Sequence, residues 1–120
     1  SYSPLISLGD MHNLKFDDNS FDIVLMGWCL AYSNNKKDAL SEANRVLKKG
    51  GSLIIGHTMF NMSEQDIVSK RGYLVASPFE KIKSKRDLDL LIKETNFKEF
   101  YSKPIEYSAS KRIIYGATTV

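Results

Sequence analysis

The sequence predicts an α/β protein with a mixed sheet, in which parallel strands are followed by a C-terminal antiparallel hairpin. Two mainly apolar runs, Phe21–Met26 and Ser52–His57, are typical of buried strands, because each is short and bounded by turn residues. A helical pattern lies between them, so a right-handed parallel crossover is the expected connection. The last two strand-like runs, Phe97–Tyr107 and Arg112–Thr118, are separated by a short polar segment and should therefore be antiparallel.

The helix between the two parallel strands is predicted over residues 35–49. Asn34 and Asn35 are both suitable N-caps, and apolar residues then recur at helical spacing. Lys48 and Lys49 fall in the expected last turn, where the helix dipole favours cations. Gly50 is expected to end the helix in a left-handed conformation.

Three further elements complete the predicted order. Leu5–Leu8 is a short apolar run that suggests a buried strand before the first loop. Ser63–Arg71 suggests a short helix in the least regular part of the chain. Ser84 and Asp87 have the spacing of a capping box and should begin another helix, which Asn96 should end in a left-handed conformation.

Composition excludes several classes of protein. The chain has 120 residues, and no run approaches the ~20 apolar residues of a membrane span, so no membrane association is expected. Cys29 is the single cysteine, which excludes a disulfide framework and suits a reducing, cytoplasmic location. With only His12 and His57 beside it, no metal site is predicted. The net charge of +3 is concentrated near residues 81–86, where a solvated surface is favoured over a nucleic-acid contact.

The candidate site lies where the predicted strands end. Ligands of open α/β sheets bind outside the carboxyl ends of the strands. Asp10 and Met11 follow the first predicted strand, Gly27 and Trp28 follow the second, and His57 ends the third. If these strands are parallel, the five residues converge on one edge of the sheet.

About forty residues form a recognisable pattern of spacing and residue type. Its positions are Asp10, Leu14, Phe16, Asp18, Ser20, Phe21, Asp22, Val24, Ala39, Leu40, Glu42, the segment Arg45–Gly51 and the segment Leu53–Ile55. This pattern resembles class I S-adenosylmethionine-dependent methyltransferases: the first part is similar to their acidic loop and fourth strand, and the second to their next helix, glycine turn and fifth strand. Lys49 stands where the family commonly has proline. The resemblance implies a partial Rossmann-like methyltransferase sheet.

The resemblance also implies a cofactor, S-adenosylmethionine, and a small-molecule methyl acceptor. Asp10 would accept a hydrogen bond from the adenine amino group, and the backbone N–H of Met11 would meet the ring. Gly27 and Trp28 would lie near the methionine end of the cofactor. A turn-capping role for Asp10 and a packing role for Trp28 are the competing interpretations.

Two residues are candidates for catalysis. His57 at a strand end could act as a general base, since histidine has a suitable intrinsic pKa. Tyr32 could face the acceptor. The alternative for His57 is a structural histidine without a chemical role, and the alternative for Tyr32 is simple packing.

The family's glycine-rich cofactor loop has no counterpart before Asp10. We therefore expect residues 1–120 to form a single incomplete methyltransferase-like domain, the C-terminal half, which alone binds the cofactor weakly and is inactive. Phe21–Met26 would then be an exposed apolar edge that needs a neighbour, either a second copy of the chain or a missing N-terminal half. The alternative function is a non-catalytic assembly or interaction module with a methyltransferase-like fold.

Overall fold

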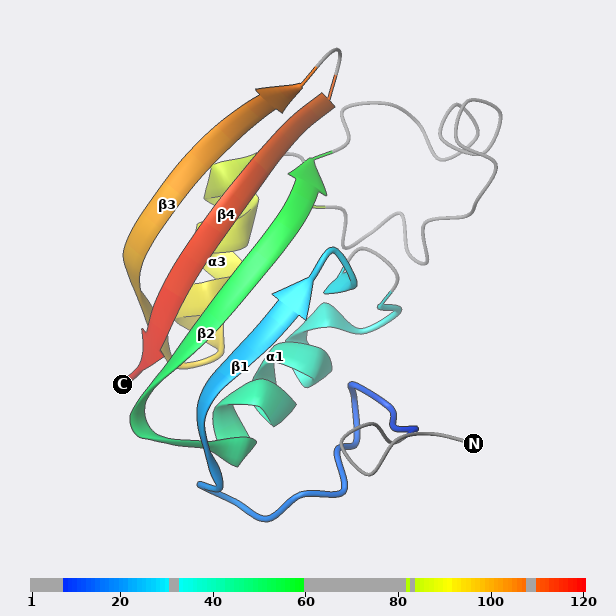
Figure 1. Cartoon of the computed structure of the whole chain (residues 1–120), viewed down its shortest axis with the longest axis vertical. Coiled ribbons are helices and arrows are strands. Elements are labelled where there is room, and N and C mark those ends of the chain that lie inside the picture. The colour runs from blue at the N-terminus through cyan, green and yellow to red at the C-terminus, as the bar shows by residue number, and fades with distance from the viewer. Residues whose placement is uncertain (1–7, 31–32, 60–81, 83, 108–109) are drawn as a thin grey trace.

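The described part of the chain forms one four-stranded mixed sheet in the order β1-β2-β4-β3 (Figure 1). This is a computed structural model, and it describes residues 8–30, 33–59, 82, 84–107 and 110–120. β1 and β2 are parallel, whereas β2 with β4 and β3 with β4 are antiparallel. The strands are β1 (Phe21–Gly27), β2 (Leu47–Met59), β3 (Phe97–Tyr107) and β4 (Ser110–Thr119).

This topology confirms the predicted mixed α/β sheet, with its parallel pair followed by an antiparallel hairpin. β1 has a partner on one side only, because β2 is its sole neighbour in the described sheet. The predicted apolar strand is therefore an edge strand. Of the strand predicted over Leu5–Leu8, only Leu8 lies within the described residues, and it belongs to no strand.

Helix α1 (Lys36–Val46) follows β1 and begins as predicted. The Asn35 side chain accepts a hydrogen bond from the backbone N–H of Asp38 at 3.1 Å. The helix ends three residues before the predicted Lys49, however, because Leu47 is extended and pairs with Phe21 of β1. The prediction that Lys48 and Lys49 occupy the last helical turn is therefore wrong.

The start of β2, which contains the double glycine, bulges away from β1. Between the pairs Phe21↔Leu47 and Ile23↔Ser52, β1 advances two residues while β2 advances five. Gly50 has the predicted left-handed conformation, with a φ of 80°, but it lies within β2 and does not end the helix. At Gly51 an added Cβ would lie 2.8 Å from the carbonyl oxygen of Lys48, so the backbone there has no room for a side chain.

Helix α3 (Lys85–Glu94) precedes the terminal hairpin. Ser84 is its N-cap, but the Ser84 side chain makes no capping hydrogen bond, so the bond that Ser84 should make in the predicted capping box is not formed. The backbone of Ser84 is extended, and its carbonyl oxygen accepts from the N–H of Leu88. Asn96 ends the helix with a φ of 64°, as predicted. The helix predicted over Ser63–Arg71 lies outside the described residues.

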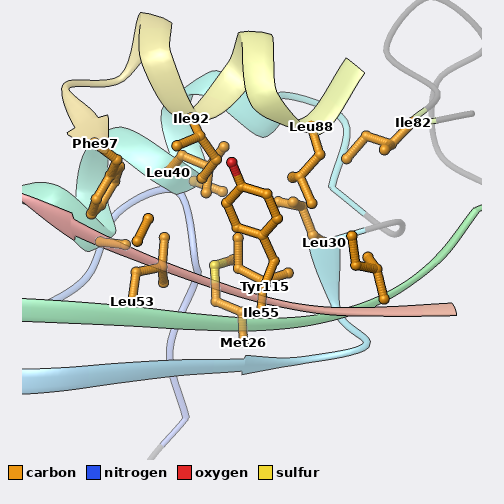
Figure 2. Close-up of a cluster of buried hydrophobic side chains, with 14 of the residues drawn as sticks. Met26, Leu30, Leu40, Leu53, Ile55, Ile82, Leu88, Ile92, Phe97 and Tyr115 are labelled. Carbon is orange, nitrogen blue, oxygen red and sulfur yellow. The ribbon is translucent and has the colours of Figure 1, made fainter. Parts of the chain in front are cut away.

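Both described helices cover the same face of the sheet (Figure 1). The core lies between these helices and the sheet (Figure 2). Alternate residues of the strands point into this layer, as expected for a strand with one face on a core. The Tyr115 ring crosses the layer, and its hydroxyl donates to Asp89 Oδ1 on α3 at 2.7 Å. The buried apolar residues include Met26, Leu30, Leu40, Leu53, Ile55, Leu88, Ile92, Phe97, Ile113 and Ala117.

We call the opposite side of the sheet the open face, because no described helix lies on it. Ile23 and Leu25 of β1 point to this side and are 64% and 72% exposed. The open face also carries glycine at one position in β2 and one in β4, and an aromatic ring lies over each glycine. At β1, the open face therefore carries exposed apolar side chains that no described helix covers.

Candidate functional site

The candidate site lies at the carboxyl ends of β1 and β2. The two strands are parallel, and Gly27, the last residue of β1, pairs with Gly56, three residues before β2 ends at Met59. The next residue, Trp28, donates its backbone N–H to the carbonyl of Gly56 at 2.8 Å, which continues the pairing past the end of β1. His57 follows Gly56 in β2. Gly27, Trp28 and His57 therefore lie next to one another along the paired strands. The prediction that His57 ends its strand is wrong, because β2 stays paired with β4 as far as Met59.

Asp10 sits in a tight turn before β1. Its carbonyl accepts from the N–H of Asn13 at 3.0 Å, and its carboxylate oxygen Oδ1 accepts from the N–H of His12 at 2.9 Å. The carboxylate remains 65% exposed. The hydrogen bonds from the His12 backbone and side chain lower the pKa of Asp10, so this carboxyl is ionised at neutral pH. The turn-capping role considered for Asp10 is therefore present, and it leaves the carboxylate accessible.

His12 joins Asp10 to the segment before α1, which the sequence analysis did not foresee. His12 Nδ1 lies 2.7 Å from Asp10 Oδ1, and His12 Nε2 lies 2.6 Å from Ser33 Oγ. Ser33 is completely buried, and its Oγ also accepts the backbone N–H of Asn35 at 3.1 Å. His12 and Ser33 are 21 residues apart, and no pattern in the sequence relates them, so the sequence carries no signal for this link.

Lys36 and His57 form a second polar pair beneath this edge. The Lys36 side chain is buried, and its Nζ donates to the Ser33 carbonyl at 3.0 Å. His57 is 2% exposed, and its Nδ1 has no hydrogen-bond partner among the described residues. Burial, followed by the positive charge of Lys36, lowers the pKa of His57 to about 4. The imidazole is therefore neutral at pH 7 and is a weak proton acceptor.

Trp28 lies on the open face and not in the core under the helices. Its φ of 54° is left-handed, which turns the chain away from β1. The indole ring covers Gly56, where an added Cβ would approach ring carbon Cζ3 to 2.7 Å. The ring is 44% exposed, so one side packs on the sheet while much of the ring stays accessible.

The remaining predicted site residues are placed differently. Gly27 has open space where a Cβ would lie, so its surroundings leave room for a side chain there. Met11 is half-buried and packs against the core cluster. Tyr32 lies outside the described residues.

An arginine fastens the acidic loop to α1. Arg45 donates to the carbonyl oxygens of Leu14 and Phe16, each at 2.8 Å, and to Asp18 Oδ1 at 2.7 Å. Arg45 also binds Glu42 through two bonds of 2.9 and 3.0 Å, and Glu42 Oε2 in turn accepts the N–H of Leu14. The Arg45 guanidinium lowers the pKa of Glu42. These contacts fix the path of the loop that carries Asp10 toward β1.

The described part of the chain contains neither a cluster of metal ligands nor a membrane-spanning helix. No three histidine, cysteine or acidic side chains there are grouped to hold a metal ion. Among the same residues, no helix is both long enough and apolar enough to cross a membrane.

Comparison with known sequences supports the motif in the first half of the chain. A family model described as a methyltransferase domain matches residues 3–55. Over 46 residues the chain is 50% identical to a demethylmenaquinone methyltransferase from Staphylococcus epidermidis. That match covers 38% of this chain and 19% of the relative, so the matched segment spans about a fifth of the relative's length.

Comparison with solved structures supports the fold over nearly the whole chain. A SAM-dependent methyltransferase from Methanosarcina mazei superposes with a TM-score of 0.74 and 17% identity, covering 95% of this chain and 66% of that one. A phosphoethanolamine N-methyltransferase from Haemonchus contortus, in complex with S-adenosylhomocysteine, gives a TM-score of 0.70 and 17% identity. It covers 92% of this chain and 36% of that one. At such identities the superpositions establish the fold alone.

Proposed function

We propose that this chain, whose residues 3–55 match a methyltransferase family model, is part of a class I S-adenosylmethionine-dependent methyltransferase and forms the adenine-binding side of that enzyme. The observation that carries the proposal is the ionised, exposed carboxylate of Asp10 in the turn before β1, which His12 links to the segment before α1. An ionised carboxylate only accepts hydrogen bonds, so it suits an amino group on the ligand.

The described residues fit the adenine end of this cofactor. Asp10 Oδ1 is occupied by His12, while Oδ2 receives no hydrogen bond from the described residues, so one oxygen is available to an adenine amino group. Met11 would place its backbone N–H against the ring. Gly27 and Trp28 would face the methionine end. When bound, S-adenosylmethionine supplies the methyl group, and the role of these residues is to bind and orient it.

Proton removal from the acceptor would fall to His57 or Tyr32 if the acceptor needs it. The low pKa of His57 makes it a poor base at pH 7, and its burial keeps it from direct contact with an acceptor. We therefore assign most of the rate to alignment of the acceptor with the methyl group, because positioning alone can supply a large acceleration.

The acceptor is proposed to be a small molecule. One sequence relative is named a demethylmenaquinone methyltransferase and one structural neighbour a phosphoethanolamine N-methyltransferase. These acceptors differ in chemistry, so the comparisons point to no individual substrate. A cytoplasmic location is part of the same proposal, since a single free cysteine, Cys29, suits a reducing compartment.

The proposal is tested by titrating the 120-residue chain with S-adenosylhomocysteine while recording backbone amide resonances. Binding should be weak, since no glycine-rich loop is present, and the largest shifts should fall at residues 10–13. D10N should remove these shifts, because the amide adds donors where the carboxylate only accepts. Unchanged amides at residues 10–13 with millimolar ligand would contradict the assignment.

A second candidate function is an assembly module without catalysis, and the open face favours it. Ile23 and Leu25 are exposed on an edge strand whose outer backbone groups have no partner strand in the described sheet. Such an edge promotes pairing with another chain. Either a second copy or a separate N-terminal half could occupy it. A folded monomer at high concentration in light scattering would count against the assembly function.

A further inference from the structure

A chain of three side chains runs from the interior of the protein to the candidate adenine site. Ser33 Oγ lies 2.6 Å from His12 Nε2, and His12 Nδ1 lies 2.7 Å from Asp10 Oδ1. The side-chain exposure rises along the chain, from 0% at Ser33 through 24% at His12 to 65% at Asp10. The buried end is therefore an anchor, and the exposed end is the only member that a ligand can reach freely.

The direction of the hydrogen bonds follows from the chemistry of each group. The Asp10 carboxylate can only accept, so His12 Nδ1 must carry a proton. In the neutral imidazole, Nε2 then accepts, and the Ser33 hydroxyl is its donor. The same Ser33 oxygen accepts the N–H of Asn35. Each of these bonds has one donor and one acceptor, which fixes the ring orientation and its tautomer.

The order of residue types is that of a serine hydrolase, but the burial is reversed. A hydrolytic triad exposes the serine nucleophile to substrate and buries the aspartate behind the histidine. Here Ser33 is buried and Asp10 is exposed. Ser33 is also held by the Asn35 N–H, and Lys36 Nζ binds its carbonyl. The arrangement does not suit nucleophilic attack by Ser33, and it does suit the orientation of Asp10.

We propose that His12 is a positioning residue that, anchored by Ser33, holds Asp10 Oδ1 so that Oδ2 faces the ligand and selects a purine with a 6-amino group. This inference rests on the function proposed above. The anchor ties the carboxylate to the first turn of α1, because Ser33 Oγ binds Asn35, which is the N-cap of that helix.

The expected consequence is selectivity as well as affinity. A carboxylate held in one orientation meets the 6-amino donor without losing rotational freedom on binding, so the amino group adds its full hydrogen bond. Without His12 the carboxylate can rotate, and part of that gain is lost. A ligand without the 6-amino group does not use the bond, so its affinity should not depend on His12.

The test compares two probes on the 120-residue chain, S-adenosylhomocysteine and its analogue with hydrogen in place of the 6-amino group. The wild-type chain should prefer S-adenosylhomocysteine by roughly tenfold, the value of a hydrogen bond to a charged group. H12A should reduce this preference to about twofold or less and leave the affinity for the 6-deamino analogue unchanged. K15A, at an exposed neighbouring position, is the matched control and should behave as wild type.

Two conservative variants distinguish the contact of His12 Nδ1 with Asp10 from the contact of Nε2 with Ser33. H12N places an amide N–H near the former Nδ1 and can still bind Asp10, so it should retain much of the preference. H12Q reaches toward Ser33 but withdraws its donor from Asp10, so it should resemble H12A. Equal behaviour of H12N and H12Q would contradict the positioning role, since simple loss of packing does not distinguish them in this way.

Nitrogen NMR of the imidazole tests the hydrogen bonds of His12 to Asp10 and Ser33 in the absence of any ligand. At pH 8 the His12 ring should be the Nδ1-protonated tautomer in the wild type, and S33A should weaken that bias. An Nε2-protonated ring in the wild type would by itself overturn the positioning role of His12. An unchanged preference for the 6-amino probe in H12A would also overturn that role, while leaving the proposed function intact. Failure of the wild type to bind either probe would overturn both.

Discussion

The indole ring of Trp28 occupies the space that a side chain at position 56 would need. Its carbons Cζ3, Cε3 and Cη2 lie 2.7 to 2.9 Å from the ideal Cβ position of Gly56. Real Cβ atoms do not approach ring carbons this closely, so Trp28 can stay in place only if residue 56 is glycine.

This contact predicts the effect of G56A. The added methyl group should displace the Trp28 ring from the open face and lower the free energy of unfolding by about 1–3 kcal/mol, as overpacking usually does. Urea denaturation measures the loss. Trp28 is the single tryptophan, so its fluorescence should also shift to longer wavelength in the native state.

G27A provides the control for that prediction. Gly27 is on the neighbouring strand and pairs directly with Gly56, but open space surrounds its Cβ position. G27A should therefore change the free energy of unfolding by less than about 0.5 kcal/mol. Equal destabilisation by G27A and G56A would mean that the Trp28 contact does not set the cost.

The burial of His57 predicts a dependence of stability on pH. Its pKa is lowered from 6.5 to about 4 in the folded chain, so between these values the unfolded chain binds more protons. The stabilisation from the neutral ring is thus fully present above pH 6.5 and is lost as the pH falls toward 4. The contribution amounts to about 3 kcal/mol over this range. Urea midpoints measured from pH 4 to 7.5 should show this slope, and H57L should flatten it.

Lys36 supplies a second test of the same site. Its positive charge is the smaller of the two causes that lower the pKa of His57, after burial. K36M should therefore raise the pH at which the His57 ring titrates, while leaving it below the ordinary value. Proton NMR of the ring measures the midpoint. An unchanged or lower midpoint in K36M would show that the charge of Lys36 does not reach His57.

The Arg45 contacts predict a local loss of order in the acidic loop. R45A should speed hydrogen exchange at the Leu14 amide, because the Glu42 carboxylate that accepts this N–H loses its own partner. R45K should rescue only part of the protection, since one ammonium cannot reach both backbone carbonyls and both carboxylates as the planar guanidinium does. Exchange at amides in β4, which Arg45 does not touch, is the internal control.

Local patterns predicted most of the elements because their information lies within short windows. The strand runs, the Asn35 cap and the left-handed Asn96 each depend on neighbouring residues, and each is present. The predicted end of α1 was wrong because Leu47 pairs with Phe21, a residue 26 positions earlier. Helical periodicity cannot show that the sheet takes over the backbone at that point.

The candidate site was predictable only in part for the same reason. Trp28 could be found because it follows an apolar run that the sequence marks as a strand. Asp10 was chosen in the same way, but the strand predicted before it lies outside the described residues except for Leu8, which belongs to no strand. The bond from His12 to Ser33 spans 21 residues and depends on the path of an irregular loop. No periodicity or spacing rule relates the two residues, so the anchor of Asp10 became visible only in three dimensions.

The open face yields a final prediction, on self-association. Leu25 is 72% exposed on the edge strand β1, and a lysine there would place a charge beside the unpaired backbone groups. L25K should change the free energy of unfolding by less than about 0.5 kcal/mol and should make the chain monomeric at concentrations where the wild type associates. Sedimentation velocity over a range of concentrations measures this.

L90K is the matched control, because Leu90 is also an exposed leucine, at 53%, but lies on α3 at the other side of the molecule. If association uses the open face, L90K should associate like the wild type. Dissociation by both variants would point to a general effect of charge on solubility, since the two lysines share nothing but their charge. A monomeric wild type would instead mean that the exposed apolar edge is tolerated in solution without a second copy.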